Sequence, residues 1–492
     1  MTEPTARNDV LQNQNMHDMY RPEYHFTPPS NWMNDPNGMV FFEGEYHLFY
    51  QYNPKATVWG PMHWGHAVSK DLINWQHLPI ALHPDEQGMI FSGSAVVDWN
   101  NSAGFGEKAL IAIFTYNKDH LETQNLAFST DKARTWTKYA DNPVIAHPGN
   151  LNDFRDPKVF WHEDHWVMCL AAGDTILFYT STNLKQWEPS GSFGGGYGST
   201  NGVWETPDLF KIPLDDGSDS RWVLTVGVGN GGPAGGSGTQ YFIGAFDGER
   251  FVSENPREVI LWADHGADYY APQSWNDEPN SRRMMLGWMS NWHYAKVTPT
   301  FTWRGVFSIP RELSLTQTTN GIRLAHKPVR ELEKLRNIHY HWRPTAIQPG
   351  LNLLDGLQGK ALEIAAEFQI AKNVKCFGFC VRVGMDERTI ISYRVKEKTL
   401  QLDRTLSGKV EFADAFAAVH SVELQPVDNL ISLQIFVDSS SIEVFANHGL
   451  AVLTDCIFPS DHSQGLELFT EGGQVILNSL DIYQLDPAKF HN

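Results

Sequence analysis

Three acidic residues of this chain lie in similar stretches, in which a proline follows the acid at once or one residue later. They are Asp35 in Asn34-Asp35-Pro36, Asp156 in Arg155-Asp156-Pro157 and Glu205 in Trp204-Glu205-Thr206-Pro207. Carboxyl groups that are held close together repel one another, so one of them retains a proton while another stays ionised. Glycoside hydrolysis requires this combination, because one group attacks the sugar and another protonates the leaving oxygen.

Taken alone, each acid also fits a purely structural role. Asp35-Pro36-Asn37-Gly38 is a common turn sequence, and an Asx-turn that closes a hairpin would explain it. Under either interpretation we expect Asp35 on an exposed turn, where a rigid scaffold displays a reactive group. The spacing favours a shared site. Asp156 and Glu205 are about 50 residues apart, and Asp35 precedes Asp156 by roughly twice that distance or slightly more.

A repeat of similar period runs through the same part of the chain. Its copies share a strand end, a serine or equivalent polar turn, and an aromatic residue that opens the next strand: 67–75, 127–136, 179–187 and, more loosely, 243–251. Four-stranded units that recur about every 40–50 residues are typical of β-propeller blades, and roughly 300 residues predict five of them. Since equivalent positions on successive blades converge on the central channel, we expect the three acids to meet there.

The pattern changes after about residue 313. Residues 327–336 are charged, with apolar residues three or four apart, which predicts a short linking helix. Leu433–Val437 and Ser441–Phe445 flank a polar turn and predict a hairpin of a β-sandwich. We therefore predict an all-β chain with a leader over 1–23, a five-bladed β-propeller over 24–325, a linker over 326–344 and a β-sandwich accessory domain over 345–492.

Charge and composition narrow the range of partners. The 492 residues include 17 tryptophans and carry a formal net charge of −19. Nucleic acids and anionic membrane surfaces require a basic patch, so neither is expected as a partner. A neutral sugar or polysaccharide fits the charge and the aromatic content, because tryptophan and tyrosine rings stack on flat apolar faces.

Neither a metal nor an organic cofactor is expected. The four cysteines form no Cys-x-x-Cys pair, and His63-Trp64-Gly65-His66 lacks a carboxylate partner. The first 30 residues contain no apolar run of the kind a signal peptide needs. The sequence as given thus predicts a cytoplasmic protein, or a secreted one if a leader was removed. A monomer or a small homo-oligomer is expected.

At these motifs the chain resembles glycoside hydrolase family 32, the β-fructofuranosidases, exo-inulinases and levanases. The resemblance covers nearly the whole chain from about residue 24, through Trp32–Gly38, Phe49–Pro54, Trp59–His66, Phe91–Ser94, Arg155–Pro157, Trp204–Leu209, Trp303–Gly305 and the hairpin at Phe436–Phe445. It implies a five-bladed propeller with a β-sandwich, and a retaining double displacement that releases terminal, non-reducing β-D-fructofuranosyl residues from levan, inulin or sucrose.

The resemblance also implies roles for individual residues. By motif match, Asp35 is the nucleophile, Glu205 the acid/base and Asp156 the stabiliser of the transition state. The fructose subsite is expected to be lined by Asn34, Gln51, Trp59, Phe91, Ser92 and Arg155, with Trp288 or Trp292 as a further wall and Asp268 as a weaker candidate. Trp59 and Phe91 could instead belong to the blade core, and Ser92 to a turn.

One position departs from the family pattern, and two other functions use the same scaffold. Thr206 stands where most members have cysteine, and a hydroxyl beside the acid/base could shift the pH profile through hydrogen bonding. A fructosyltransferase would pass the fructosyl group to a sugar instead of water. A non-catalytic fructan-binding propeller would have no need of Glu205.

Overall fold

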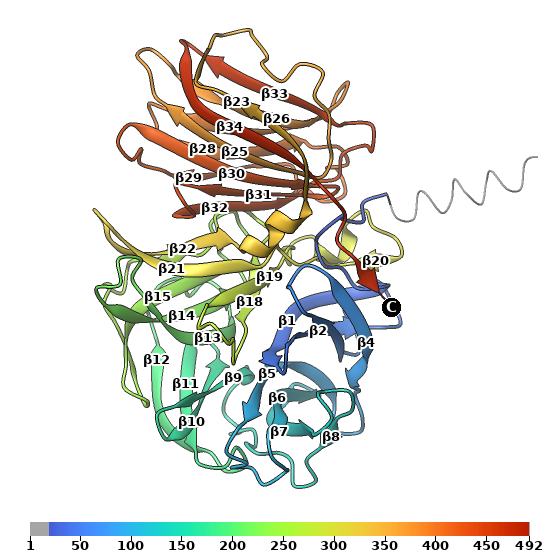
Figure 1. Cartoon of the computed structure of the whole chain (residues 1–492). Coiled ribbons are helices and arrows are strands. Elements are labelled where there is room, and N and C mark those ends of the chain that lie inside the picture. Colours follow the sequence, from blue (N-terminus) through green and yellow to red (C-terminus); the bar gives the residue numbers. More distant parts are fainter. Residues whose placement is uncertain (1–18, 492) are drawn as a thin grey trace, which may run out of the picture.

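The computed structural model describes residues 19–491, and these form an all-β chain with two parts (Figure 1). Five sheets surround a common axis in the N-terminal part, and two sheets pack face to face in the C-terminal part. The predicted five-bladed propeller and β-sandwich are therefore confirmed. Most of the predicted leader lies outside the described residues. Within the described part, no helix is long and apolar enough to cross a membrane.

Each blade is an antiparallel sheet whose strands follow one another from the axis outward. The first contains β1 (Asn31–Phe42), β2 (Glu45–Asn53), β3 (His63–Ser69) and β4 (Trp75–Leu82). The second contains β5 (Met89–Asp98), β6 (Ala109–Lys118), β7 (Leu121–Ser129) and β8 (Thr137–Lys138). The third contains β9 (Arg155–His162), β10 (His165–Ala172), β11 (Thr175–Ser181) and β12 (Glu188–Gly194).

The last two blades complete the ring. The fourth contains β13 (Trp204–Pro213), β14 (Ser220–Val228), β15 (Gly238–Phe246), β16 (Phe251–Ser253) and β17 (Leu261–Trp262). The fifth contains β18 (Tyr270–Ser274), β19 (Met284–Trp288), β21 (Arg311–Thr318) and β22 (Gly321–Pro328). A 3₁₀ turn, η1 (Ala295–Val297), precedes β20 (Trp303–Arg304), which pairs with β1. The C-terminal β35 (Phe490–His491) pairs with β4 and so ties the chain end to the first blade.

The sandwich follows a short connection. The linking helix predicted over 327–336 is a 3₁₀ helix, η2 (Arg330–Leu335). One sheet holds β23 (Arg336–Trp342), β34 (Val475–Leu485), β25 (Leu362–Gln369), β30 (Leu430–Asp438), β31 (Ser441–Ala446) and β32 (Ala451–Cys456), with β24 (Thr345–Ile347) beside β34. The other holds β29 (Val419–Glu423), β28 (Thr399–Leu406), β27 (Arg388–Arg394), β26 (Cys376–Val383) and β33 (Gly465–Glu471). The predicted hairpin is β30–β31.

The sequence repeat marks the turn between the third and fourth strands of a blade. In the first blade the indole N–H of Trp75 donates to the carbonyl of Leu72 at 3.0 Å. In the third blade Trp187 donates to the carbonyl of Leu184 at 2.9 Å, and the hydroxyl of Ser181 accepts the backbone N–H of Leu184. The serine and tryptophan thus close the same turn in different blades, which explains why the sequence repeat predicts the blades.

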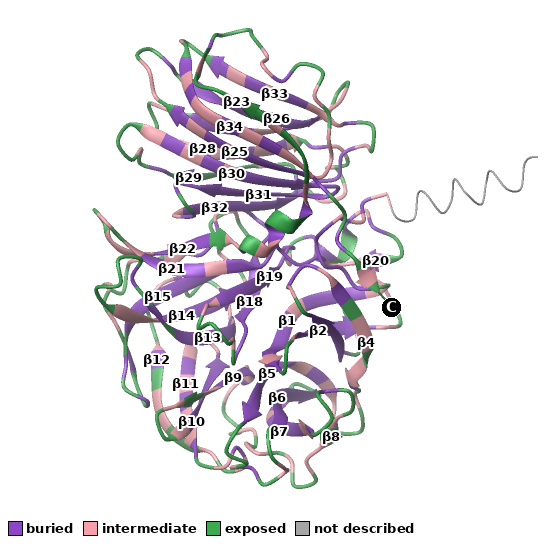
Figure 2. Ribbon diagram, viewed as in Figure 1, coloured by how far each residue is buried: buried purple, intermediate pink, exposed green. Residues whose placement is uncertain are grey.

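The innermost strands β1, β5, β9, β13 and β18 are neighbours around the axis. Figure 2 shows how completely β1, β5 and β13 are buried. All five strands shift register against their second strand near their first residues, as a β-bulge does: between Met33 and Pro36, Ile90 and Gly93, Arg155 and Lys158, Glu205 and Asp208, and Tyr270 and Gln273. Bulges of this kind change the direction of side chains next to functional sites. The bulges therefore direct side chains of the innermost strands into one end of the central channel.

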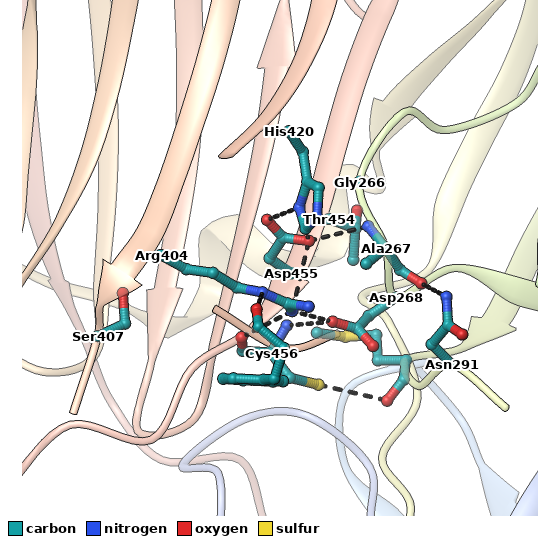
Figure 3. Close-up of polar contacts among 12 residues, drawn as sticks. Gly266, Ala267, Asp268, Asn291, Arg404, Ser407, His420, Thr454, Asp455 and Cys456 are labelled. Atoms are coloured by element: carbon teal, nitrogen blue, oxygen red, sulfur yellow. Dashed lines mark hydrogen bonds and ion pairs between the residues drawn. The ribbon is translucent and has the colours of Figure 1, made fainter. Parts of the chain in front are cut away.

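Buried charges join the sandwich to the propeller. Arg404 on β28 donates to a carboxylate oxygen of Asp268, just before β18, at 2.6 Å, and both side chains are fully buried (Figure 3). The same oxygen accepts the backbone N–H of Cys456 at 2.8 Å. Asp455 lies 3.6 Å from Arg404 and is held by His420 at 2.7 Å. A charge in this position is tolerable only while its partners remain.

We predict that Arg404→Met lowers the free energy of unfolding by about 3–5 kcal/mol, because the carboxylates of Asp268 and Asp455 would stay buried without their cation. Urea denaturation measures the effect as a lower midpoint. Arg394→Met is the matched control, since Arg394 is an exposed arginine of the adjacent strand. Equal midpoints for the two variants would contradict the prediction.

Candidate active site

A cavity of about 680 Å³ opens where the innermost strands begin. Asp35, Asp156 and Glu205 all line it. Its other lining residues are Asn34, Gln51, Trp59, Met89, Phe91, Ser92, Asn117, Asp119, His120, Glu122, Asn152, Asp153, Arg155, Trp292 and Lys296. The structure therefore brings together the three acids and seven of the other residues named from sequence.

Asp35 lies within strand β1, at its bulge, so the expectation of an exposed turn is wrong. Asn34 and Asp35 are the unpaired residues of the bulge, and Pro36 resumes the pairing with β2 opposite Tyr50. The amide of Asn34 donates to one carboxylate oxygen at 3.0 Å, and the hydroxyl of Ser92 donates to the other at 2.7 Å. The indole of Trp32 holds the Asn34 amide in turn. The orientation of the Asp35 carboxylate is thus fixed.

Burial and the nearby charge of Glu205 raise the pKa of Asp35 to about 6, although the hydrogen bonds from Ser92 and Asn34 act in the opposite direction. Burial likewise raises the pKa of Asp156 well above its usual value, with Glu205 and Asp35 adding to the effect and Arg155 opposing it. Clustered carboxyls with displaced pKa values are typical of catalytic sites.

Asp156 and Glu205 are positioned by neighbouring bulges. Asp156 and Thr206 adopt left-handed backbone conformations, with φ of 65° and 49°. Non-glycine residues adopt this conformation at an energetic cost, and such strain concentrates at functional sites. The strain lets the backbone N–H of Thr206 donate to Asp156 at 2.9 Å. One bulge therefore orients both the acid that precedes Thr206 and the acid on the adjacent blade.

Arg155 is the cation that joins the acids. Its guanidinium donates to Glu205 at 3.0 Å, to Asp153 at 2.6 Å and to Glu122 at 3.2 Å. Burial lowers the pKa of Arg155, but the surrounding carboxylates outweigh that effect, so the net shift is upward and the group stays charged. Glu122 and Asp153 were not identified from the sequence, because neither carries a proline or glycine signal of its own.

Tyr270 is a second partner of Glu205, and it was not predicted from the sequence. Its hydroxyl donates to the second carboxylate oxygen of Glu205. Burial and the charge of Glu205 raise the pKa of Tyr270 well above its usual value, so the phenol remains a donor. A signal was present in the sequence: Tyr270-Ala271-Pro272 has the same spacing to proline as Glu205-Thr206-Pro207, and Ala271 is left-handed like Thr206.

Asp268 and Trp288 do not line the cavity. Asp268 is fully buried against the sandwich, where it accepts from Tyr294, Arg404 and Cys456 (Figure 3). The structure therefore places Asp268 away from the cavity, in contrast to the expectation that it lines the fructose subsite. Trp288 is buried behind Trp292, with ring centroids 4.8 Å apart. Of the two tryptophans considered as a wall, the structure places Trp292 at the cavity.

The hydroxyl of Thr206 is buried, and among the described residues it has no hydrogen-bond partner. The hydroxyl therefore has no direct route to Glu205, and the hydrogen bond from Thr206 to Asp156 comes from the backbone. The proposed shift in pH profile stays a prediction. Thr206→Cys tests it: a displaced pH–rate profile would support side-chain tuning, and an unchanged profile would reject it.

Potential metal ligands gather away from this cavity. Within residues 19–491, one group of three ligand atoms lies within 4.8 Å, from His339, His341 and Asp481 on the sandwich. In the cavity itself the acids are held by hydrogen-bond donors and by Arg155. The arrangement suits proton transfer and nucleophilic attack by carboxyl groups.

Two family models match the chain. The Glycosyl hydrolases family 32 N-terminal domain matches residues 25–328, and the Glycosyl hydrolases family 32 C-terminal domain matches residues 331–484. A levanase of Bacillus subtilis (strain 168) is 54% identical over 477 residues, which cover 95% of this chain and 70% of the relative.

Solved structures agree with these matches. An exo-inulinase from Aspergillus awamori superposes with a TM-score of 0.89 at 36% identity, covering 95% of this chain and 98% of that one. A fructofuranosidase from Schwanniomyces occidentalis complexed with fructosylnystose superposes with a TM-score of 0.86 at 31% identity, covering 96% and 98%.

We predict that Asp35→Asn stabilises the fold above pH 6. Because the folded-state pKa of Asp35 is about 6 against an ordinary value of 3.8, the native protein binds one more proton than the unfolded chain between these pH values, and its stability falls as the pH rises through them. The variant lacks this penalty, so its gain should be about 3 kcal/mol at pH 7 and vanish below about pH 4.

Urea unfolding across this pH range measures the difference in stability between the variant and the wild type. Asp414→Asn, on an exposed turn of the sandwich, serves as the control. Parallel pH–stability curves for the wild type and Asp35→Asn would contradict the prediction.

Proposed function

The chain belongs to glycosyl hydrolases family 32, and on that premise we propose that it is an exo-acting fructan hydrolase. It would release terminal, non-reducing β-D-fructofuranosyl residues from levan, inulin or sucrose. The observation that carries the proposal is the placement of Asp35, Asp156 and Glu205 in one cavity. The likeness to a levanase and to an exo-inulinase along nearly the whole chain supports it.

In the proposed mechanism Asp35 attacks the anomeric carbon of the terminal fructosyl unit. The bond to the leaving oxygen breaks as Glu205 transfers its proton to that oxygen. The resulting fructosyl ester on Asp35 is then cleaved by water, from which Glu205 takes a proton. The donors Asn34 and Ser92 point the carboxylate of Asp35 before substrate arrives, and this orientation lowers the entropy cost of attack.

Glu205 must alternate between its acid and base forms, and two partners support this change. Arg155 and Tyr270 each donate to a different carboxylate oxygen. Both donors keep their protons across the working pH range, because the pKa values of Arg155 and Tyr270 are raised. Asp156, fixed by the backbone of Thr206, would accept hydrogen bonds from fructose hydroxyls and offset positive charge at the anomeric centre.

The sugar would enter past aromatic side chains. Trp59 and Phe91 meet at 6.1 Å in an edge-to-face arrangement at the cavity, and Trp292 lines it from the fifth blade. Trp59 is 36% exposed. Rings of this kind stack on the apolar faces of sugars. The cytoplasmic location and the monomeric or small oligomeric state stay predictions.

We expect wild-type protein to release free fructose from sucrose and from levan, and Glu205→Gln to lower kcat by at least about 100-fold, because general acid–base catalysis typically contributes that much. Chromatography of the products over time measures both. Glu258→Gln, on an exposed loop of the propeller, is the matched control.

The same product analysis separates the rival functions. Longer oligosaccharides formed at high sucrose concentration would indicate a fructosyltransferase. Undiminished fructose release by Glu205→Gln would contradict the assigned acid/base. Binding of levan without any product would indicate a non-catalytic propeller.

Tyr270→Phe tests the support of Glu205. It removes one hydrogen-bond donor from the reacting carboxyl while the ring still fills its site. We expect kcat to fall by about 10-fold or more with KM nearly unchanged, since the interaction acts on proton transfer and not on substrate binding. A rise in KM at constant kcat would instead mean that Tyr270 binds the sugar.

A further inference from the structure

A second cavity, of about 380 Å³, lies at the opposite end of the same innermost strands. It shares no lining residue with the active-site cavity. In β5, Ser92 lines the first cavity and Val97 the second. In β9, Arg155 lines the first and Trp161 the second. At roughly 3.3 Å per residue the two cavities are about 15–20 Å apart along the strands, so they face opposite ends of the propeller.

Tryptophans dominate this second cavity. Trp99, Trp161, Trp166 and Trp222 all line it. Trp99 is 52% exposed and Trp161 is 40% exposed, which makes them the most exposed tryptophans among the described residues. Core packing does not account for large rings left at the mouth of a cavity, because burial of such rings is what stabilises a core.

Both exposed rings are held in place. The indole N–H of Trp99 donates to the carboxylate of Asp277 at 2.9 Å. The indole N–H of Trp161 donates to the carbonyl of Glu163 at 2.9 Å, and its ring meets Trp166 edge to face at 5.0 Å. Rings that are already oriented lose little conformational freedom when a ligand binds.

The polar groups of the cavity are few and of mixed sign. Asp277 is the acidic residue of the cavity, Lys211 and Arg283 are the basic ones, and Asn100 and Asn276 are neutral amides. Arg283 is anchored by the hydroxyl of Ser274 at 3.2 Å. A site for a charged ligand would show one dominant sign. Aromatic faces with scattered donors and acceptors suit a neutral ligand that is rich in hydroxyl groups.

We propose that this cavity is a second carbohydrate-binding site, which holds a short segment of a β-fructan chain while a chain end is processed at the active-site cavity. The proposal rests on the proposed function, because the enzyme would meet the polymer as its substrate. Its volume lies in the lower part of the range for small-molecule sites, about 300–1,000 Å³. Sugar rings would stack on Trp99 and Trp161, and their hydroxyls would meet Lys211 and Asp277.

A second site changes the affinity of the enzyme for polymers and leaves the turnover of small substrates unaffected. Binding at two points raises the effective concentration of chain ends near the enzyme. Sucrose is too short to reach from one end of the propeller to the other. The proposal therefore predicts a lower KM for levan than the active-site cavity alone would give, with no effect on sucrose.

Levan retention in native affinity electrophoresis tests the proposal, with Glu205→Gln as background so that the polymer is not consumed. Adding Trp99→Ala and Trp161→Ala should weaken retention by about 10-fold or more, and Trp161→Tyr, which keeps a stacking ring, should restore part of it. Ile338→Ala, an exposed apolar residue of the sandwich, is the control. Saturating free fructose, which fills the active-site cavity, should leave the Trp-dependent retention in place.

In the active enzyme the same tryptophan changes should raise KM for levan several-fold and leave kcat/KM for sucrose within about twofold, which also shows that the fold is intact.

Unchanged levan retention in the double variant would overturn the proposal, as would complete loss of retention with fructose. Dissociation of an oligomer with unchanged retention would assign the cavity to contacts between copies of the chain. Failure of the wild type to release fructose from sucrose would reject the proposed function, while the retention comparison would still decide the second site.

Discussion

The cavity depends on one cation, Arg155, placed among carboxylates that would otherwise repel. Asp35, Asp156 and Glu205 line the same space as Asp153 and Glu122, and Arg155 donates to three of these five acids. A buried cation that bonds several carboxylates offsets their desolvation and mutual repulsion. It leaves Asp35 and Asp156 with raised pKa values, so the cluster remains poised between protonated and ionised forms.

The backbone supplies the geometry that this charge cluster needs. A regular strand would alternate its side chains strictly, but the bulge at the start of each innermost strand resets that alternation beside the channel. The prolines after Asp35, Asp156, Glu205 and Tyr270 mark four of these bulges. In the remaining blade the bulge lies at Phe91 and Ser92 and ends at Gly93, where a β-carbon would come within 2.1 Å of the carbonyl oxygen of Ile113. The reacting groups therefore stand on rigid, buried strands instead of loops.

The blades, the sandwich hairpin and the grouping of the acids were predictable because each has a local signal: a repeated serine–tryptophan turn, alternating apolar residues, or an acid near a proline. The error about Asp35 came from interpreting Asp-Pro-Asn-Gly as a turn, whereas tertiary pairing with β2 makes it a bulged strand. Tyr270 reaches Glu205, whereas Asp268, two positions earlier, is buried against Arg404 of the sandwich. Contacts such as Asp268 with Arg404 join residues 136 apart in sequence, and no local pattern encodes them.

In the proposed mechanism Asp35 is a covalent nucleophile, and trapping the intermediate tests this role directly. Glu205→Gln is mixed with a fructoside that carries a good leaving group, the reaction is quenched rapidly, and the peptides are analysed by mass spectrometry. Formation of the fructosyl ester is then faster than its hydrolysis, so the intermediate accumulates. We predict a fructosyl ester on the peptide that contains Asp35. A modification on Asp156, or turnover of the activated substrate with no adduct on any carboxylate, would contradict it.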